Sequence, residues 1–187
     1  LYKAALAMCT FKPEEKRETQ IRMAEALLNA RHGTEAPKMF VAAAEGADRL
    51  TIVDISNPAA PVYAGSVTHA TQLNAAVSME LAGDYAYVTA YTGNCLTIVN
   101  ISNPSSPSIT GSVCDNTYLF DARMLSLSGK FAYVPTFVAN RLTVVDISNP
   151  AAPVIVGSIQ SSTALEQSWA AAVSGGYVYV TSRIDDQ

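Results

Sequence analysis

The sequence predicts an all-β fold, a β-propeller of four-stranded antiparallel blades with an α-helical segment before it. The main observation is a repeated phrase. LTIVDISNPAAP at Leu50 recurs as LTIVNISNPSSP at Leu96 and as LTVVDISNPAAP at Leu142, with 46 residues between successive copies. Two further phrases keep the same spacing, and each has the composition of a short strand between turn residues. A fixed period whose unit holds four such strands is typical of a propeller blade.

The four strands of a repeat are identified from its phrases. LTIVDI is apolar on both alternating faces, so we expect it to be covered on both sides by stacked sheets. PVYAGSV and its copies form the strand after the Ser-Asn-Pro turn, and YAYV-type runs form the strand after each repeated glycine. A fourth, less regular strand precedes that glycine, in NAAVSMELA, FDARMLSLS and EQSWAAAVS.

The composition is that of a globular chain with a substantial core. Of 187 residues, 49% are hydrophobic and 15% charged. The net charge is -4, and no Lys/Arg cluster occurs in the repeats. This balance argues against nucleic acid or an anionic membrane as the main partner. No run of 18 apolar residues is present, so no transmembrane segment is predicted.

Residues 1–37 lack the repeat. PEEKRETQIRMAEALLNARHG predicts an amphipathic helix that begins near Pro13 and ends at Gly33. It could cap an exposed blade edge or dock a partner. The sequence starts without Met and ends directly after a strand-like run, so we interpret it as a fragment of a longer protein. No signal peptide is recognised, and without the natural start none is excluded.

The phrases LTIVDISNPAAPV and AVSGGYVYV resemble the LVIVD repeat, whose hallmark is such a strand followed by a Ser-Asn/Asp-Pro turn. The resemblance covers roughly residues 38–187. It implies propeller blades in a family whose members are mostly uncharacterised and often secreted or attached to the cell surface, and it implies no catalytic motif. The expected units are a partial blade at 38–68, blades at 69–114 and 115–160, and a partial blade at 161–187. Closing a ring of four to eight blades would need further blades or a second chain.

Comparison of the repeats separates scaffold from candidate site. The turns after the first and third strands are nearly identical in every repeat, whereas the connections at the other face of the ring differ. Propellers bind ligands at such variable loops and at the channel mouth. The candidate ligand contacts are His69, Gln72, Tyr118, Asp121, Arg123, Glu166 and Trp169. The structural alternative is that Asp121 and Arg123 pair with neighbours while Trp169 fills the channel.

No catalytic residues, metal ligands or cofactors are predicted. The chain has only two His residues and no GxSxG, P-loop, HExxH or CxxC motif, although an Asp/Glu oxygen site stays open. Asp54 and Asp146 are repeated carboxylates, but Asn100 takes the same place in the middle repeat. A turn-stabilising acceptor tolerates that exchange and an acid catalyst does not.

Two of the three cysteines could pair. If Ile101 lies opposite Ser108 in the antiparallel register, Cys95 lies opposite Cys114 and could form a disulfide. Two buried thiols are the alternative, and Cys9 is unassigned. A bridge would favour an oxidising compartment.

Three functions follow as hypotheses. The first is a non-catalytic scaffold, extracellular or at the cell surface, whose variable loops bind a protein or a carbohydrate. The second is an enzyme whose active site at the channel mouth is completed by further blades. The third is a structural or assembly module.

Overall fold

The computed structural model describes residues 39–44 and 48–183, and within them every regular element is a strand. The helix expected within residues 1–37 lies outside the described residues. A sheet of three described strands comes first, with β1 (Met39–Ala44), β2 (Arg49–Asp54) and β3 (Val62–Thr68). The next contains β4 (Ala76–Ala82), β5 (Tyr85–Ala90), β6 (Cys95–Asn100) and β7 (Ser108–Cys114).

The third sheet contains β8 (Ser126–Ser128), β9 (Phe131–Thr136), β10 (Arg141–Asp146) and β11 (Val154–Gln160). The last described sheet contains only β12 (Ser168–Ser174) and β13 (Tyr177–Ser182). All pairings between strands are antiparallel and join sequence neighbours. The described residues therefore confirm an all-β fold with four-stranded antiparallel sheets of the expected period. We number the four sheets as blades 1 to 4 in chain order.

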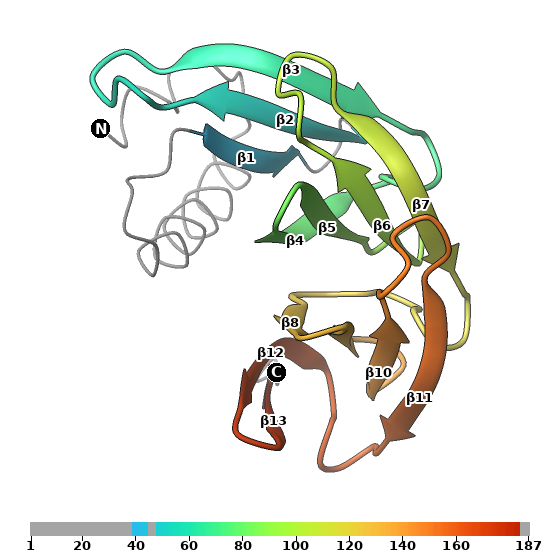
Figure 1. Cartoon of the computed structure of the whole chain (residues 1–187). Coiled ribbons are helices and arrows are strands. Elements are labelled where there is room, and N and C mark those ends of the chain that lie inside the picture. The colour runs from blue at the N-terminus through green and yellow to red at the C-terminus, as the bar shows by residue number, and fades with distance from the viewer. Residues whose placement is uncertain (1–38, 45–47, 184–187) are drawn as a thin grey trace.

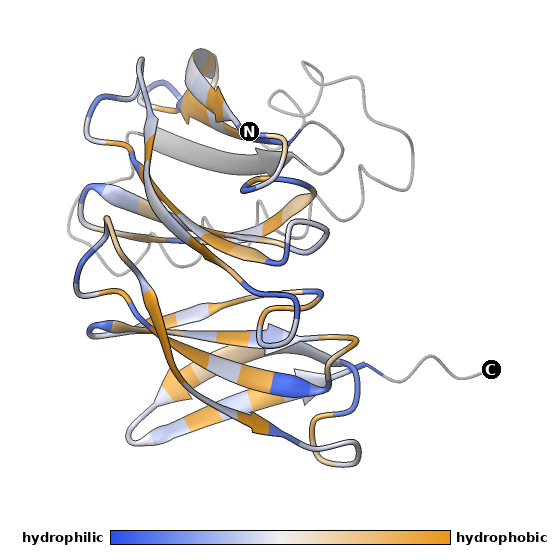
Figure 2. Cartoon of the chain, turned by 90° about the vertical axis from the view of Figure 1, so that its right-hand side faces the viewer, coloured by the Kyte–Doolittle hydropathy of each residue, from blue (hydrophilic) through white to orange (hydrophobic). Residues whose placement is uncertain are grey.

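The blades follow one another along an arc (Figure 1). The fourth strands β3, β7 and β11 lie on its outer side, and the first strands β4, β8 and β12 lie toward the inside. Figure 2 shows apolar residues along the strands and hydrophilic residues gathered in the connections at their ends. No helix in the described part of the chain is long and apolar enough to cross a membrane.

The core consists of two apolar layers between successive blades. One layer joins blades 1 and 2 through Leu50 and Ile52 of β2 and Val88 of β5. The other joins blades 2 and 3, with Ile98 of β6 against Val134 of β9. Strand β6 contributes to both layers, and five of its six residues are buried. The expected double covering of this strand is confirmed, and each such Leu or Ile side chain contributes about 1.5–3 kcal/mol by leaving water.

The Ser-Asn-Pro turns have the predicted side-chain support. Asp54, Asn100 and Asp146 each accept a hydrogen bond from the backbone N–H two residues later, at 2.8–2.9 Å. A carboxylate and an amide oxygen are interchangeable as acceptors here, which explains why Asn100 substitutes for aspartate. The hydrogen bonds that Asp54 accepts from Ser56 lower its pKa below its usual value.

The expected pairing of Ile101 with Ser108 is wrong. Asn100 lies opposite Ser108, and a β-bulge between Ile98 and Val99 shifts the register by one residue before Gly111. The same irregularity occurs in blades 1 and 3. Such a bulge adds a residue to one strand and bends it. The sequence analysis counted residue pairs from the turn without a bulge, because nothing in the alternation of apolar residues indicates the extra residue.

A glycine in the fourth strands of blades 1 and 2 lies where two blades meet. A Cβ at Gly111 would lie 2.5 Å from the carbonyl oxygen of Pro150 and 2.7 Å from that of Ala151, in the Ser-Asn-Pro turn of blade 3. A Cβ at Gly65 would overlap the Pro104 carbonyl of blade 2 in the same way. The repeated Gly-Ser therefore exists because a backbone turn of the next blade packs directly on it.

Candidate functional site

The variable connections come together at one face of the arc, as the repeats predict. We call this the variable face, formed by residues 69–75, 91–94, 115–121, 137–140 and 161–167. Backbone hydrogen bonds tie these connections in pairs, for example from Tyr91 N–H to the Ala75 carbonyl and from Phe137 N–H to the Asp121 carbonyl. At the opposite face, Ile101 N–H donates to the carbonyl of Asp84. The variable loops are thus held in place by backbone contacts and not by side chains alone.

His69 stabilises a turn. Its Nδ1 accepts hydrogen bonds from the backbone N–H groups of Thr71 at 3.2 Å and Gln72 at 3.0 Å. The residues one and two periods later, Asp115 and Ser161, accept from the same two positions of their own loops. Three different side chains therefore have the same structural role, because each accepts backbone hydrogen bonds that cap a tight turn. His69 is exposed and its Nδ1 is occupied by these two hydrogen bonds, so a ligand could contact only the Nε2 edge of the ring.

Gln72 and Tyr118 occupy equivalent places and brace their loops against the outer strands. The Gln72 Nε2 donates to Ser112 Oγ of β7 at 2.6 Å. The Tyr118 ring lies 5.0 Å from the guanidinium of Arg141, which donates in turn to Ser158 and Gln160 of β11. Tyr118 is 40% exposed, so one ring face is accessible.

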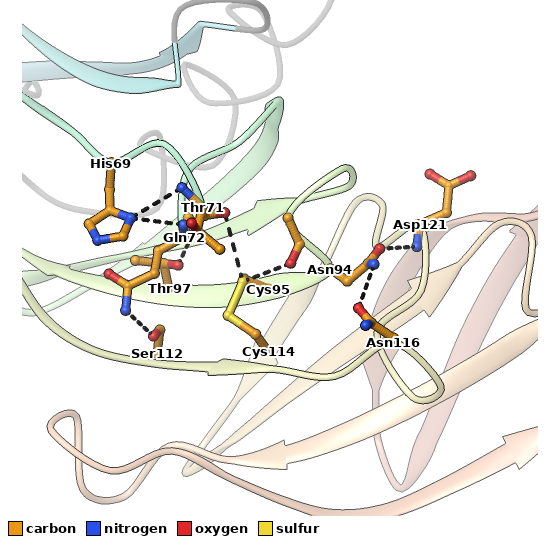
Figure 3. The surroundings of a disulfide bond; sticks show 11 residues. His69, Thr71, Gln72, Asn94, Cys95, Thr97, Ser112, Cys114, Asn116 and Asp121 are labelled. Carbon is orange, nitrogen blue, oxygen red and sulfur yellow. Dashed lines mark hydrogen bonds between the residues drawn. A yellow bond between two sulfur atoms is a disulfide. The ribbon is translucent and has the colours of Figure 1, made fainter.

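A repeated joint between blades was missed by the sequence analysis. Asp48, Asn94 and Asn140 stand one period apart, each with a positive φ near 50°. Each side-chain Oδ1 accepts the N–H of a residue in the next blade, at 3.1, 3.0 and 2.8 Å, the donors being Ala75, Asp121 and Gln167. Figure 3 shows the bond from Asp121 N–H to Asn94. The signal was an Asp or Asn at every period inside loops whose other residues vary, and this residue type tolerates the left-handed conformation.

Arg123 and Trp169, whose residue types differ between the repeats, lie close to each other and to aromatic rings of the neighbouring connections. The Arg123 guanidinium carbon lies 4.6 Å from the Tyr91 ring centroid, 5.3 Å from that of Phe137 and 4.9 Å from that of Trp169. Trp169 packs edge-on against Phe137 at 5.7 Å, and the Arg183 guanidinium lies 5.4 Å from the Trp169 ring. These five residues, from three blades, form what we call the inner cluster. Cation–π contacts of this kind contribute about 0.5–2 kcal/mol each.

Arg123 of the inner cluster also forms a shielded ion pair with Asp121, which lies outside the cluster. Arg123 Nη2 lies 2.7 Å from Asp121 Oδ1, and their side chains are 16% and 12% exposed. That oxygen and Arg123 Nε have no hydrogen-bond partner among the described residues. The short distance without hydrogen-bond alignment identifies a close charge contact, not a bidentate pair. Asp121 and Arg123 thus pair as the structural alternative expected, while Trp169 stays half-buried and Glu166 is exposed.

The backbone that carries Arg123 is irregular. The first strand of blade 3 is reduced to β8, and Met124 instead exchanges hydrogen bonds with the Trp169 carbonyl and the Ala171 N–H of blade 4. Thr89 Oγ1 of blade 2 donates to the Arg123 carbonyl at 2.8 Å. Arg123 is therefore held from both neighbouring blades, so the cluster is preorganised.

Glu80 links the inner strands of blades 2 and 3. Its Oε2 accepts a hydrogen bond from the Leu127 N–H at 3.1 Å. Burial raises the pKa of this carboxyl, and the Leu127 hydrogen bond opposes that shift. The period places serine and alanine in the equivalent positions of the other two blades, so this contact is specific to one joint.

Cys95 and Cys114 lie opposite each other on β6 and β7 and are joined by a disulfide, with a Cα–Cα distance of 4.1 Å (Figure 3). The bulge lies between this pair and the turn, so the register at the cysteines is the one expected although the register at the turn is not. Cys9 lies outside the described residues. Within the described ranges, no group of three or more His, Cys, Asp or Glu side chains is placed to hold a metal ion.

A family model for the LVIVD repeat matches four segments, residues 40–69, 75–115, 121–161 and 167–184. The chain belongs to the LVIVD repeat family. The matched segments coincide with the four described blades, and the residues between them, 70–74, 116–120 and 162–166, belong to the variable face. No curated protein matches this sequence.

Solved structures share the fold. A protein from Lactobacillus plantarum matches with a TM-score of 0.63 and 15% identity, over 79% of this chain and 48% of the other. A putative 6-phosphogluconolactonase from Bacteroides uniformis matches with a TM-score of 0.64 and 15% identity, over 81% and 49%. A computationally designed protein, Ika4, matches with a TM-score of 0.58 and 10% identity, over 80% and 82%. This LVIVD chain spans about half the length of the two natural proteins, and at these identities the likeness shows the fold alone.

Proposed function

We propose that this LVIVD-repeat protein is a non-catalytic scaffold that binds a protein or carbohydrate partner at its variable face, with the inner cluster as the centre of the site. One observation carries the proposal. Residues that differ between blades, Arg123 and Trp169, are brought together with Tyr91, whereas residues that repeat are used in turns and joints.

The chemistry of the cluster supports a binding role. Trp, Tyr and Arg dominate the energetically important positions of protein interfaces, because they combine large apolar area with a polar edge. Trp169 is already packed against Phe137 and Arg123, so its ordering costs little on binding. The half-buried Trp169 and the exposed side chains of Glu166 and Arg183 would meet the ligand.

The other candidate residues take supporting roles in this proposal. Arg123 is a positioning residue, because its charge faces Asp121 and its planar group faces three aromatic rings. His69 and Gln72 shape the loop at the rim. An extracellular or cell-surface location is part of the proposal and is supported by the Cys95–Cys114 disulfide, because such bonds persist in oxidising compartments.

Binding can be tested with the single tryptophan as a reporter. The wild type and Trp169→Ala are screened against a glycan array and an array of surface-protein peptides, and hits are titrated by biolayer interferometry. We expect Trp169→Ala to weaken any true ligand by about 30-fold, the effect of losing about 2 kcal/mol. The same ligand should change the Trp169 emission of the wild type.

The matched control is Tyr63→Ala, which removes a 58%-exposed aromatic ring of blade 1 that lies outside the variable face. Its affinity should equal that of the wild type. Equal affinities of Trp169→Ala and the wild type for every hit would contradict the proposal.

A further inference from the structure

The Ser-Asn-Pro turn of blade 2 carries a modification motif that the other repeats lack. Asn100, Ile101 and Ser102 form Asn-X-Ser, the acceptor sequence for an N-linked glycan. No other Asn-X-Ser or Asn-X-Thr without proline at X occurs in the 187 residues. The equivalent triplets begin with Asp54 and Asp146, which have no amide nitrogen to modify. The motif therefore belongs to one blade and not to the repeat.

The side chains of this motif are already in contact. Asn100 Oδ1 accepts hydrogen bonds from the backbone N–H of Ser102 at 2.9 Å and from Ser102 Oγ at 2.6 Å. Both bonds lie within three consecutive residues, so this turn can form before the blade folds around it. Both also strengthen as the amide nitrogen gives up a proton, because negative charge then gathers on Oδ1. The turn thus favours reaction at Asn100 Nδ2.

The reacting nitrogen is accessible. Asn100 is half-buried and Ser102 is exposed. Asn100 Nδ2 donates no hydrogen bond to a described residue, and it is not one of the buried polar atoms left without a partner in the described part of the chain. A polar atom that has no partner there and is not buried reaches solvent.

The place of Asn100 in the fold also suits a bulky group. Asn100 is the last residue of β6, at the face opposite the variable face, so a glycan there leaves the inner cluster uncovered. The Cys95–Cys114 disulfide joins β6 to β7 of the same blade. Disulfides persist in oxidising compartments, and N-linked glycans are features of secreted proteins, so both modifications belong to one route.

We propose that Asn100 is the attachment site of an N-linked glycan. Nδ2 forms a bond to the anomeric carbon of a lipid-linked glycosyl diphosphate, and the bond from that carbon to the diphosphate oxygen breaks. The diphosphate leaves with the electron pair, and Nδ2 loses one proton. An oligosaccharyltransferase of the secreting cell performs the transfer. The product keeps Oδ1 as an acceptor, so both hydrogen bonds from Ser102 survive.

Mass spectrometry of secreted protein tests the proposal. The full chain is secreted, behind a cleavable signal, from a cell with an N-glycosylation pathway. We expect one glycan, on the peptide that contains Asn100, and its release by a peptide N-glycosidase that converts Asn100 to aspartate. The matched control is Asn100→Asp, which should fold like the wild type without a glycan, because Asp54 and Asp146 hold the same turn.

The hydroxyl of Ser102 is tested separately. Ser102→Ala should lose the glycan while keeping the backbone hydrogen bond to Asn100, and Ser102→Thr should retain the glycan. Asn103 is an internal comparison, because its Oδ1 accepts Ser105 Oγ at 2.8 Å but Pro104 follows it. It should stay unmodified.

Three results would each overturn the proposal: an unmodified Asn100 in the secreted wild type, a glycan retained in Ser102→Ala, or a glycan on Asn100→Asp. The proposal rests on the extracellular or cell-surface location proposed above, and not on what the inner cluster binds. The two are distinguished in the same sample, since a Cys95–Cys114 bridge beside an unmodified Asn100 would overturn the glycan alone and leave the location standing.

Discussion

Gly111→Ala and Gly157→Ala are one substitution at two equivalent places, and the account predicts opposite effects. The Cβ at Gly111 would lie 2.5 and 2.7 Å from two backbone carbonyl oxygens, where ordinary contact begins at 3.4 Å. Backbone oxygens cannot move aside as a side-chain end can, so blades 2 and 3 must separate. Overpacking of this kind costs about 1–3 kcal/mol. At Gly157 nothing described lies within 4 Å, so the added methyl group meets no obstacle.

Gly157→Ala should stabilise the folded chain slightly. Replacing glycine at a compatible φ restricts the unfolded chain and contributes about 0.4–1 kcal/mol. The same unfolded-state term applies to Gly111→Ala, so the two variants should differ by the overpacking cost alone, about 1–3 kcal/mol in the free energy of unfolding. The assay is urea denaturation followed by circular dichroism. Equal effects of the two substitutions would refute the reasoning that the turn of the next blade dictates this glycine.

Three further predictions concern the joints. Asn94→Ala removes the acceptor of the Asp121 N–H and should cost about 1–3 kcal/mol in urea denaturation, with no loss expected if the bond is absent in solution. Reduction of Cys95–Cys114, which closes a loop of 19 residues, should cost about 3 kcal/mol, and thiol titration of the unfolded chain without reductant should find one free Cys and not three. Burial raises the folded-state pKa of Glu80 above its usual value of 4.5, so the folded protein binds this proton more tightly than the unfolded chain. The free energy of unfolding of the wild type should therefore fall, relative to that of Glu80→Gln, as pH rises from 4.5 through the raised pKa. Parallel curves of stability against pH for the two proteins would contradict this.

The repeated residues made the fold predictable. A strand such as LTIVNI needs cover on both faces, and β6 has it because both neighbouring blades supply the same kind of strand. The exchange of Asp54 for Asn100 correctly indicated a turn-stabilising role, since repetition with a chemical exchange shows which property is needed. The bulge could not be predicted, because an extra residue in one strand leaves the apolar pattern intact.

The candidate site was predicted in part, because a residue can differ between repeats for two reasons. It can have a role of its own, or it can be a chemical equivalent that makes the same structural contact. Arg123 and Trp169 vary and meet in the inner cluster. His69 also varies from its equivalents, yet all three cap the same turn, since imidazole, carboxylate and hydroxyl can each accept a backbone N–H. Conversely, Asn94 repeats within a loop that otherwise varies. Sequence shows the exchange of side chains, and the contacts distinguish structural equivalents from residues with a role of their own.

The central claim is that repeated residues hold the fold and that the inner cluster binds the partner. The most direct test measures binding and unfolding for Trp169→Ala and for Asp48→Ala, which removes the repeated joint between blades 1 and 2, away from the inner cluster. For a ligand found with the wild type, we predict that Trp169→Ala loses binding in the folded protein. Asp48→Ala should unfold more easily and bind with wild-type affinity while folded. Loss of binding in Asp48→Ala together with full binding in Trp169→Ala would contradict the account.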